Sequence, residues 1–203
     1  MVAAAAILAL YGFARPRTMS PADRAAAAAK FKFERSQLPE VPGPAPRTFR
    51  AVSPAFKHIE GWISGVGASV ALADLDSNGL PDDVCYVDTR TDQVIVAPAP
   101  GSPPRYAPFA LDPAPLPYSA SKAAPMGCRA ADFNEDGWPD LLVVADLGTT
   151  TLWWNRGDGT FEDGTTAANA DTATKGMGSS IADVNDDGHL DVFVTGIDPD
   201  PYA

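Results

Sequence analysis

A nine-residue acidic pattern, D-x-[DN]-x-[DN]-G-x-x-D, occurs three times in this 203-residue chain and constrains its fold more than any other feature. The copies occupy residues 74–82, 132–140 and 183–191, so their first residues are 58 and 51 positions apart. Each copy is followed by an apolar segment with strand propensity. Repeats of this length are typical of solenoids and propeller blades, whose units cannot bury their apolar faces alone.

The residue types in this pattern indicate a site for a divalent cation. Calcium takes six to eight oxygen ligands at about 2.3–2.6 Å, and acids or amides at positions 1, 3 and 5 of a curled loop supply such oxygens. Glycine at position 6 permits the sharp turn, the carbonyl of position 7 faces the ion, and the Asp at position 9 completes the shell. Magnesium fits less well, because it demands near-octahedral geometry. The alternative is three acidic turns on a solvated rim.

The pattern thus predicts up to three bound calcium ions (Ca2+), one in each loop. The predicted ligands are Asp74, Asp76, Asn78, Leu80 and Asp82 in the first loop, Asp132, Asn134, Asp136, Trp138 and Asp140 in the second, and Asp183, Asn185, Asp187, His189 and Asp191 in the third. Leu80, Trp138 and His189 contribute only their backbone carbonyls. Each loop carries three carboxylates at these positions, which repel one another at close range when no cation is bound.

The three loops are not EF-hands. An EF-hand loop needs a Glu at position 12 and a helix on each side, whereas position 12 here is Cys85, Val143 or Val194. The residues after each loop are rich in Val and Leu and favour strands. The sequence therefore predicts an all-β fold in which each loop lies at the turn of a hairpin.

The remaining elements are predicted from local patterns. Strands are predicted at residues 63–75, 83–87, 93–97, 127–133, 141–145, 149–155, 176–184 and 192–195. Residues 98–125, rich in Pro, Ala and Ser, are predicted to form a long surface insertion. Upstream, Ser20 and Pro21 predict the start of a helix that runs to about residue 37. The five prolines of residues 39–54 predict a linker or an extended lead-in.

The loops, together with the segment LWWNRGDGTF at residues 152–161, resemble FG-GAP/VCBS repeats, which build the calcium-bearing β-propellers of integrin α subunits and of many secreted bacterial proteins. The segment GMGSSIAD at residues 176–183 is similar to the branch related to cartilage acidic protein. The resemblance covers about residue 61 to the C-terminus. It implies four-stranded blades with a calcium loop between the first two strands of each.

By this resemblance the chain is a partial β-propeller of about two and a half blades, with an N-terminal helical and linker segment. The blades are expected at about residues 61–125, 126–175 and 176–203, after a helix and Pro-rich linker at residues 20–60. Known propellers close with about 4–8 blades. An open array exposes apolar faces, so we expect the chain to be a fragment completed by further blades, or to need an oligomer partner.

The two cysteines, Cys85 and Cys128, match no zinc-binding spacing. One disulfide and two buried free thiols both remain open from the sequence. The resemblance puts Cys85 in the second strand of one blade and Cys128 in the first strand of the next, so that contact between the blades can bring them together.

Residues 1–19 form an apolar, signal-like or anchor segment. The run at residues 2–14 is too short for a membrane span of about 20 residues but fits the apolar core of a signal peptide. No Lys or Arg precedes the run, whereas Arg15 and Arg17 follow it; the first turns of a buried helix are the alternative. We expect a secreted or membrane-anchored protein with extracytoplasmic repeats.

The net charge of −11 argues against nucleic acid as a partner. Ser179 and Ser180 have no His–Asp arrangement nearby to activate them. One of the neighbouring Trp153 and Trp154 is expected to face the core. We therefore expect a calcium-binding module for extracellular binding, adhesion or scaffolding, with a protein or carbohydrate ligand. The alternative is a propeller-based carbohydrate-active enzyme, a lyase or hydrolase, whose catalytic residues lie outside this segment.

Overall fold

A computed structural model describes Tyr11 and residues 18–52, 54–112, 124–146, 150–170 and 175–197. The chain divides into two compact units, Met1–Gln37 and Leu38–Ala203. Helix α2 (Pro21–Ala28) lies in the first unit, and the Ser20 side chain caps it by accepting the Asp23 N–H at 3.1 Å. The predicted helix start is thus confirmed.

Helix α2 ends at Ala28, whereas the sequence predicted a helix to about residue 37. None of its residues is buried, so no packing supports a longer helix, and short isolated helices are marginal in water. Within the described residues, no helix is long and apolar enough to cross a membrane. Most of the apolar run at residues 2–14 lies outside the described residues.

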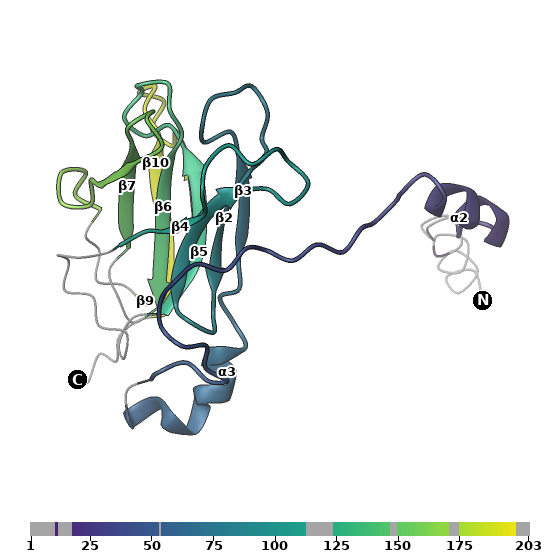
Figure 1. Ribbon diagram of the computed structural model, residues 1–203, viewed down its shortest axis with the longest axis horizontal. Helices are drawn as coiled ribbons and strands as arrows, with labels where there is room; N and C mark the ends of the chain where they lie inside the picture. Colours follow the sequence, from purple (N-terminus) through teal and green to yellow (C-terminus); the bar gives the residue numbers. More distant parts are fainter. Residues whose placement is uncertain are drawn as a thin grey trace, which may run out of the picture. The chain divides into compact units, whose positions relative to one another are not determined.

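The second unit contains three antiparallel sheets (Figure 1). The first sheet has strands β1 (Val70–Ala73), β2 (Asp83–Asp88), β3 (Gln93–Pro98) and β4 (Phe109–Ala110); the second has β5 (Ala124–Ala131), β6 (Asp140–Asp146), β7 (Thr151–Asn155) and β8 (Phe161–Asp163); the third has β9 (Lys175–Ala182) and β10 (Asp191–Ile197). In each of the four-stranded sheets, neighbours in sequence are neighbours in space. The fold is mostly β and consistent with two full blades and part of a third, as predicted.

The first strands of the three sheets face one another. Residues 69–72, 126–130 and 177–179, in or next to β1, β5 and β9, line a common hollow. In a propeller, the blades are arranged radially around a central channel. The arrangement therefore matches consecutive blades around part of such an axis.

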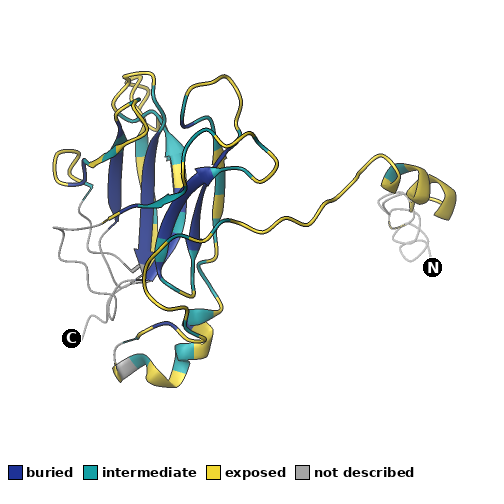
Figure 2. Ribbon diagram, viewed as in Figure 1, coloured by how far each residue is buried: buried dark blue, intermediate teal, exposed yellow. Residues whose placement is uncertain are grey.

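The core forms where the blades face each other, and Figure 2 shows the buried strands in dark blue. Because side chains alternate along a strand, β2 sends Cys85 and Val87 toward the second sheet and Val84 and Tyr86 to the opposite face. Trp153 belongs to the first of these clusters, as expected for one of the two tryptophans. The second and third sheets meet in a separate cluster centred on Leu142, Val144 and Leu152.

A disulfide joins Cys85 in β2 to Cys128 in β5, with Cα atoms 6.2 Å apart. It links the first two blades across the core. Of the two alternatives that the sequence left open, a disulfide or two free thiols, the disulfide is thus the one confirmed. Both sulfurs lie among buried apolar residues. The crosslink spans a sequence separation of 43 residues, so it restricts the unfolded chain substantially.

The Pro-rich segment ahead of the blades is an extended lead-in that lies against the first blade. Tyr86 donates its hydroxyl hydrogen to the carbonyl of Pro39, and Val41 packs on the outer face of the sheet. Further along, the buried Arg50 lies 3.2 Å from Asp92 and donates to the carbonyl of Pro125 at 3.0 Å. The lead-in thus covers apolar residues that the first blade would otherwise expose.

Two local predictions were wrong. Residues 63–75 were predicted as one strand, but Ile63 lies in helix α3 (Glu60–Ser64), which follows a 3-10 helix at Pro54–Ile59. Gly67 then has a φ of +84°, a conformation outside the strand region, so only Val70–Ala73 forms a strand.

The predicted insertion at residues 98–125 supplies the fourth strand of the first blade. Its described part places β4 against β3, buries Leu111 and packs Tyr106 and Phe109 on the core. Prolines flank this apolar segment and hid it from the pattern analysis. Residues 113–123 of the predicted insertion lie outside the described residues.

Replacing both cysteines, Cys85→Ala with Cys128→Ala, should lower the free energy of unfolding by about 2–4 kcal/mol, because the unfolded chain regains the freedom of a long closed loop. Urea denaturation of both proteins measures the loss. Reducing the unmodified protein should produce a comparable loss and leave the double variant unchanged. Equal stability of all samples would show that the crosslink does not restrain the blades.

Candidate metal-binding loops

Each acidic pattern joins the first two strands of its sheet. Loop 1 (residues 74–83) connects β1 to β2, loop 2 (residues 132–140) connects β5 to β6, and loop 3 (residues 183–191) connects β9 to β10. Loops 2 and 3 lie side by side at one end of the sheets (Figure 1), where His189 Nδ1 is 2.6 Å from Glu135 Oε1. The predicted hairpin position of the loops is confirmed.

The acid that closes loop 1 is Asp83 rather than Asp82. Strand pairing sets the residue before each loop opposite its closing acid, in the pairs Ala73–Asp83, Ala131–Asp140 and Ala182–Asp191. Each closing acid accepts, through Oδ2, the N–H of the second residue of its loop, at 2.8 Å from Leu75, 2.9 Å from Phe133 and 3.0 Å from Val184. Loop 1 is one residue longer, so the ungapped pattern assigned its ninth position to Asp82.

The three loops share one backbone conformation. The fourth residue of each is left-handed, with φ values of 51° at Ser77, 59° at Glu135 and 61° at Asp186. The glycine at position 6 has φ values of 89° at Gly79, 93° at Gly137 and 91° at Gly188. A side chain at these glycines would meet no atom within 4 Å, so backbone conformation rather than space requires glycine.

The carboxylate at position 1 organises the turn. In loop 2, Asp132 accepts the N–H of Asp136 at 3.1 Å and the N–H of Gly137 at 2.9 Å, one on each oxygen. Loops 1 and 3 repeat this arrangement around Asp74 and Asp183. The loops are therefore curled by their own acids, with two N–H groups directed at one carboxylate.

Positions 3, 5 and 7 follow the same scheme. In loop 2, Asp136 accepts the N–H of Trp138 at 2.9 Å, and Asn134 donates its side-chain amide to Asp136 at 2.8 Å. Asn185, Asp187 and His189 repeat both bonds in loop 3. In loop 1, Asn78 holds position 5 and accepts the N–H of Leu80 at 2.9 Å. An amide therefore replaces the acid at position 5 without loss of this turn bond.

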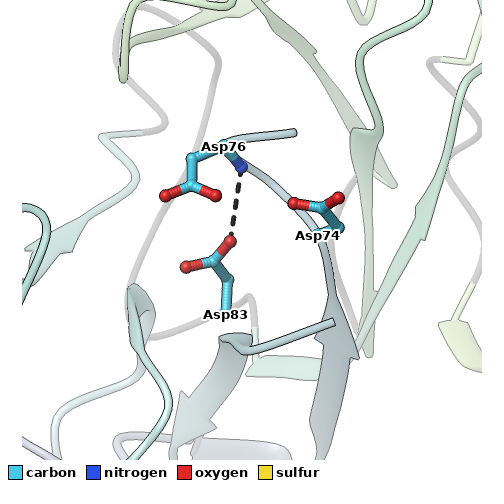
Figure 3. Close-up of side chains that lie close together, drawn as sticks. All are labelled: Asp74, Asp76 and Asp83. Atoms are coloured by element: carbon cyan, nitrogen blue, oxygen red, sulfur yellow. Dashed lines mark hydrogen bonds between the residues drawn. The ribbon is translucent and has the colours of Figure 1, made fainter. Parts of the chain in front are cut away.

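Three carboxylates converge in loop 1. Asp74, Asp76 and Asp83 each offer an oxygen within 4.8 Å of the other two, and this triad can hold a metal ion (Figure 3). Among the described residues, no other group of three acids, histidines or cysteines meets that distance. Loops 2 and 3 have Asn134 and Asn185 at position 3, so the corresponding set in each of them consists of two carboxylates and an amide.

Loop 1 also contains a cation from elsewhere in the chain. Arg105, in the segment between β3 and β4, pairs with Asp76, with Asp82 at 2.7 Å and with Asp83. Although burial raises the pKa of Asp82, hydrogen bonds from Asn78 and Arg105 hold it below its ordinary value. Loop 1 thus differs from loops 2 and 3 in that an arginine of the chain pairs with its acids.

The closing acid of loop 2 is a structural centre that connects two blades. Asp140 is fully buried and accepts the N–H groups of Phe133 and Asn155 at 2.9 and 2.8 Å, while burial raises its pKa. The side chain of Asn155 donates to the carbonyl of Leu75 in loop 1 at 2.8 Å and to that of Pro139 at 3.1 Å. Neither Asn155 nor Arg105 was predicted as a site residue from the sequence. Asn155 is recognisable only as the first residue of the N-R-G-D-G turn.

Two side chains at position 7 behave differently from each other. The indole of Trp138 lies on Gly157 of its own blade, where an added Cβ would fall 2.4 Å from it. His189 is exposed, and the carboxylate of Glu135 raises its pKa through a hydrogen bond. Both residues remain predicted ligands only through their backbone carbonyls.

The fold and the loops define a repeat protein with propeller-type blades and an acidic corner in each. Residues 114–194 match the FG-GAP-like repeat family, and this part of the chain is an FG-GAP-like repeat. The match includes loops 2 and 3 and confirms the resemblance seen in the sequence. Comparison with curated proteins and with solved structures gave no match.

The Gly137→Ala variant should lose about 1–3 kcal/mol of stability, because alanine is strained at a φ of +93°. Gly127→Ala is the matched control, since a Cβ there also meets nothing within 4 Å but the backbone is not left-handed. Thermal melting in chelator measures both variants without a metal contribution. Equal melting temperatures for the two variants would contradict the conformational role of Gly137.

Proposed function

We propose that the chain is a calcium-binding β-propeller module for extracellular binding, adhesion or scaffolding. The observation that carries this proposal is the common geometry of the three loops, which share φ angles and the bonds around the first acid. An accidental acidic turn would not repeat both features three times. A carbohydrate-active enzyme remains an alternative hypothesis that no specific observation favours.

The chemistry of the loops supports calcium as the bound ion. Position 1 has both oxygens next to N–H donors, and positions 3 and 5 add carboxylate or amide oxygens around the same turn. Calcium accepts such mixed oxygen ligands in flexible geometry. A bound ion removes the mutual repulsion of the acids and thereby holds the first hairpin of each blade. Calcium would therefore stabilise the blade corners rather than take part in a reaction.

Asp136→Asn tests this proposal with little structural disturbance, because Asn78 makes the equivalent turn bond in loop 1. At free calcium ten times the Kd, one site contributes about 1.4 kcal/mol, or about 3–5 °C in Tm; because the variant keeps an amide oxygen but removes a negative charge that attracts the ion, it should lose part of this calcium-induced rise. Asp158→Asn is the control, since Asp158 is an exposed acid that accepts the Thr160 N–H outside the loops. Differential scanning fluorimetry with calcium or chelator measures both variants. If calcium does not change the Tm of the unmodified protein, the proposal is contradicted.

We also propose that the protein is secreted or membrane-anchored, with its blades outside the cytoplasm. The disulfide between Cys85 and Cys128 supports an oxidising compartment, because cytosolic proteins seldom keep such bonds. Calcium at the concentrations found outside cells would fill loops of moderate affinity. Expression with and without an export signal, followed by thiol titration in denaturant, tests the compartment: free thiols in the exported protein would contradict it.

The partner proposed for this module is another blade surface, supplied by further blades or by a second copy. Phe193 on β10 is 66% exposed and Val184 is 77% exposed, although equivalent faces of the first two blades are buried. Multi-angle light scattering should show a molar mass that rises with concentration, and Phe193→Glu should reduce the rise. Trp62→Glu, an exposed aromatic on α3, is the control. A constant monomer mass would argue against self-association.

A further inference from the structure

Loop 1 is already bound to a cation of the chain itself. Arg105 directs Nε at Asp76, Nη1 at Asp82 and Nη2 at Asp83, so that its planar guanidinium spans three carboxylates. Two of these acids belong to the triad that can hold a metal ion. The guanidinium therefore competes for the oxygens that a metal in loop 1 would use.

The surrounding residues fix Arg105 in this position. The hydroxyl of the next residue, Tyr106, donates to Asp83 Oδ1 at 2.9 Å, and the Tyr106 ring packs against Phe109 with ring centroids 6.2 Å apart. Phe109 in turn belongs to β4 and packs on the core. An arginine held by this segment approaches loop 1 at little cost in side-chain freedom, and it stays charged at every physiological pH.

Loops 2 and 3 provide an internal comparison. In the part of the chain that the structure describes, no arginine or lysine forms a salt bridge with their acids. Position 3 of these loops is also an amide, Asn134 or Asn185, where loop 1 has the carboxylate of Asp76. The loop with a third carboxylate in this cluster is thus the one that Arg105 contacts, as expected for like charges that otherwise repel.

We infer that Arg105 replaces calcium in loop 1, so that calcium fills loops 2 and 3 while the arginine keeps loop 1 closed. This inference rests on the proposed calcium function, and it lowers the number of ions from the three that the sequence predicted to two. It also makes the first blade, which carries the lead-in, independent of calcium. Calcium would stabilise the second and third blades, whereas the stability of the first blade would not change with calcium.

Calcium titration of the full chain by isothermal calorimetry tests the inference. The unmodified protein should bind two ions, and Arg105→Gln should bind three, because glutamine frees the triad of Asp74, Asp76 and Asp83. Arg90→Gln is the matched control, since Arg90 also pairs with carboxylates, Asp88 and Glu40, but lies away from the loops. It should bind two ions. Without calcium, Arg105→Gln should melt at a lower temperature than the control, and calcium should restore more of its stability.

Asp76→Ala, which removes the position 3 oxygen from loop 1, gives a second measurement in the otherwise unmodified chain that does not depend on the folding of the Arg105 variant. The account expects this variant to bind two ions, as the unmodified protein does. Three ions in the unmodified protein and two in Asp76→Ala would overturn the inference while the calcium function stands. No binding by any of the proteins, Arg105→Gln included, would overturn the function and the inference together.

Discussion

The carboxylate that closes each acidic loop accepts an N–H from the start of that loop, and the rest of the structure depends on this bond. In the first two blades these acids, Asp83 and Asp140, are fully buried, and they fix where the first strand ends and the second begins. A buried acid without donors would be costly. The hydrogen bonds therefore specify the geometry of each loop before any ion binds. A cation bound by the acids of a loop would stabilise that geometry further.

The corners of neighbouring blades are coupled. Asn155 accompanies Asp140 at the second corner and donates to the carbonyl of Leu75 at the first, while the disulfide of Cys85 and Cys128 joins the strands beneath. In repeat proteins, stability is shared between units and their interfaces. Loop 2 is therefore in direct contact with the first blade, and the lead-in around Val41 covers the other face of that blade.

Much of the fold followed from the spacing of the acids and from the strands beside them, because a hairpin corner is a local feature. The sequence failed where distant residues decide the outcome. Asp83, rather than the predicted Asp82, closes loop 1, because the pairing of β1 with β2 determines which acid lies opposite the start of the loop. Arg105 lies 22 residues beyond Asp83 in a Pro-rich segment, where no local pattern marks an arginine as the counterion of an acidic loop.

Terbium luminescence tests the central claim most directly, because Trp138 belongs to loop 2 and can transfer excitation energy to a lanthanide bound there. The account predicts terbium emission when tryptophan is excited, and loss of that emission when calcium is added in excess. Asp136→Asn should weaken the emission, whereas Asp158→Asn should leave it unchanged. Absence of emission, or emission that excess calcium does not displace, would contradict a calcium site at this corner.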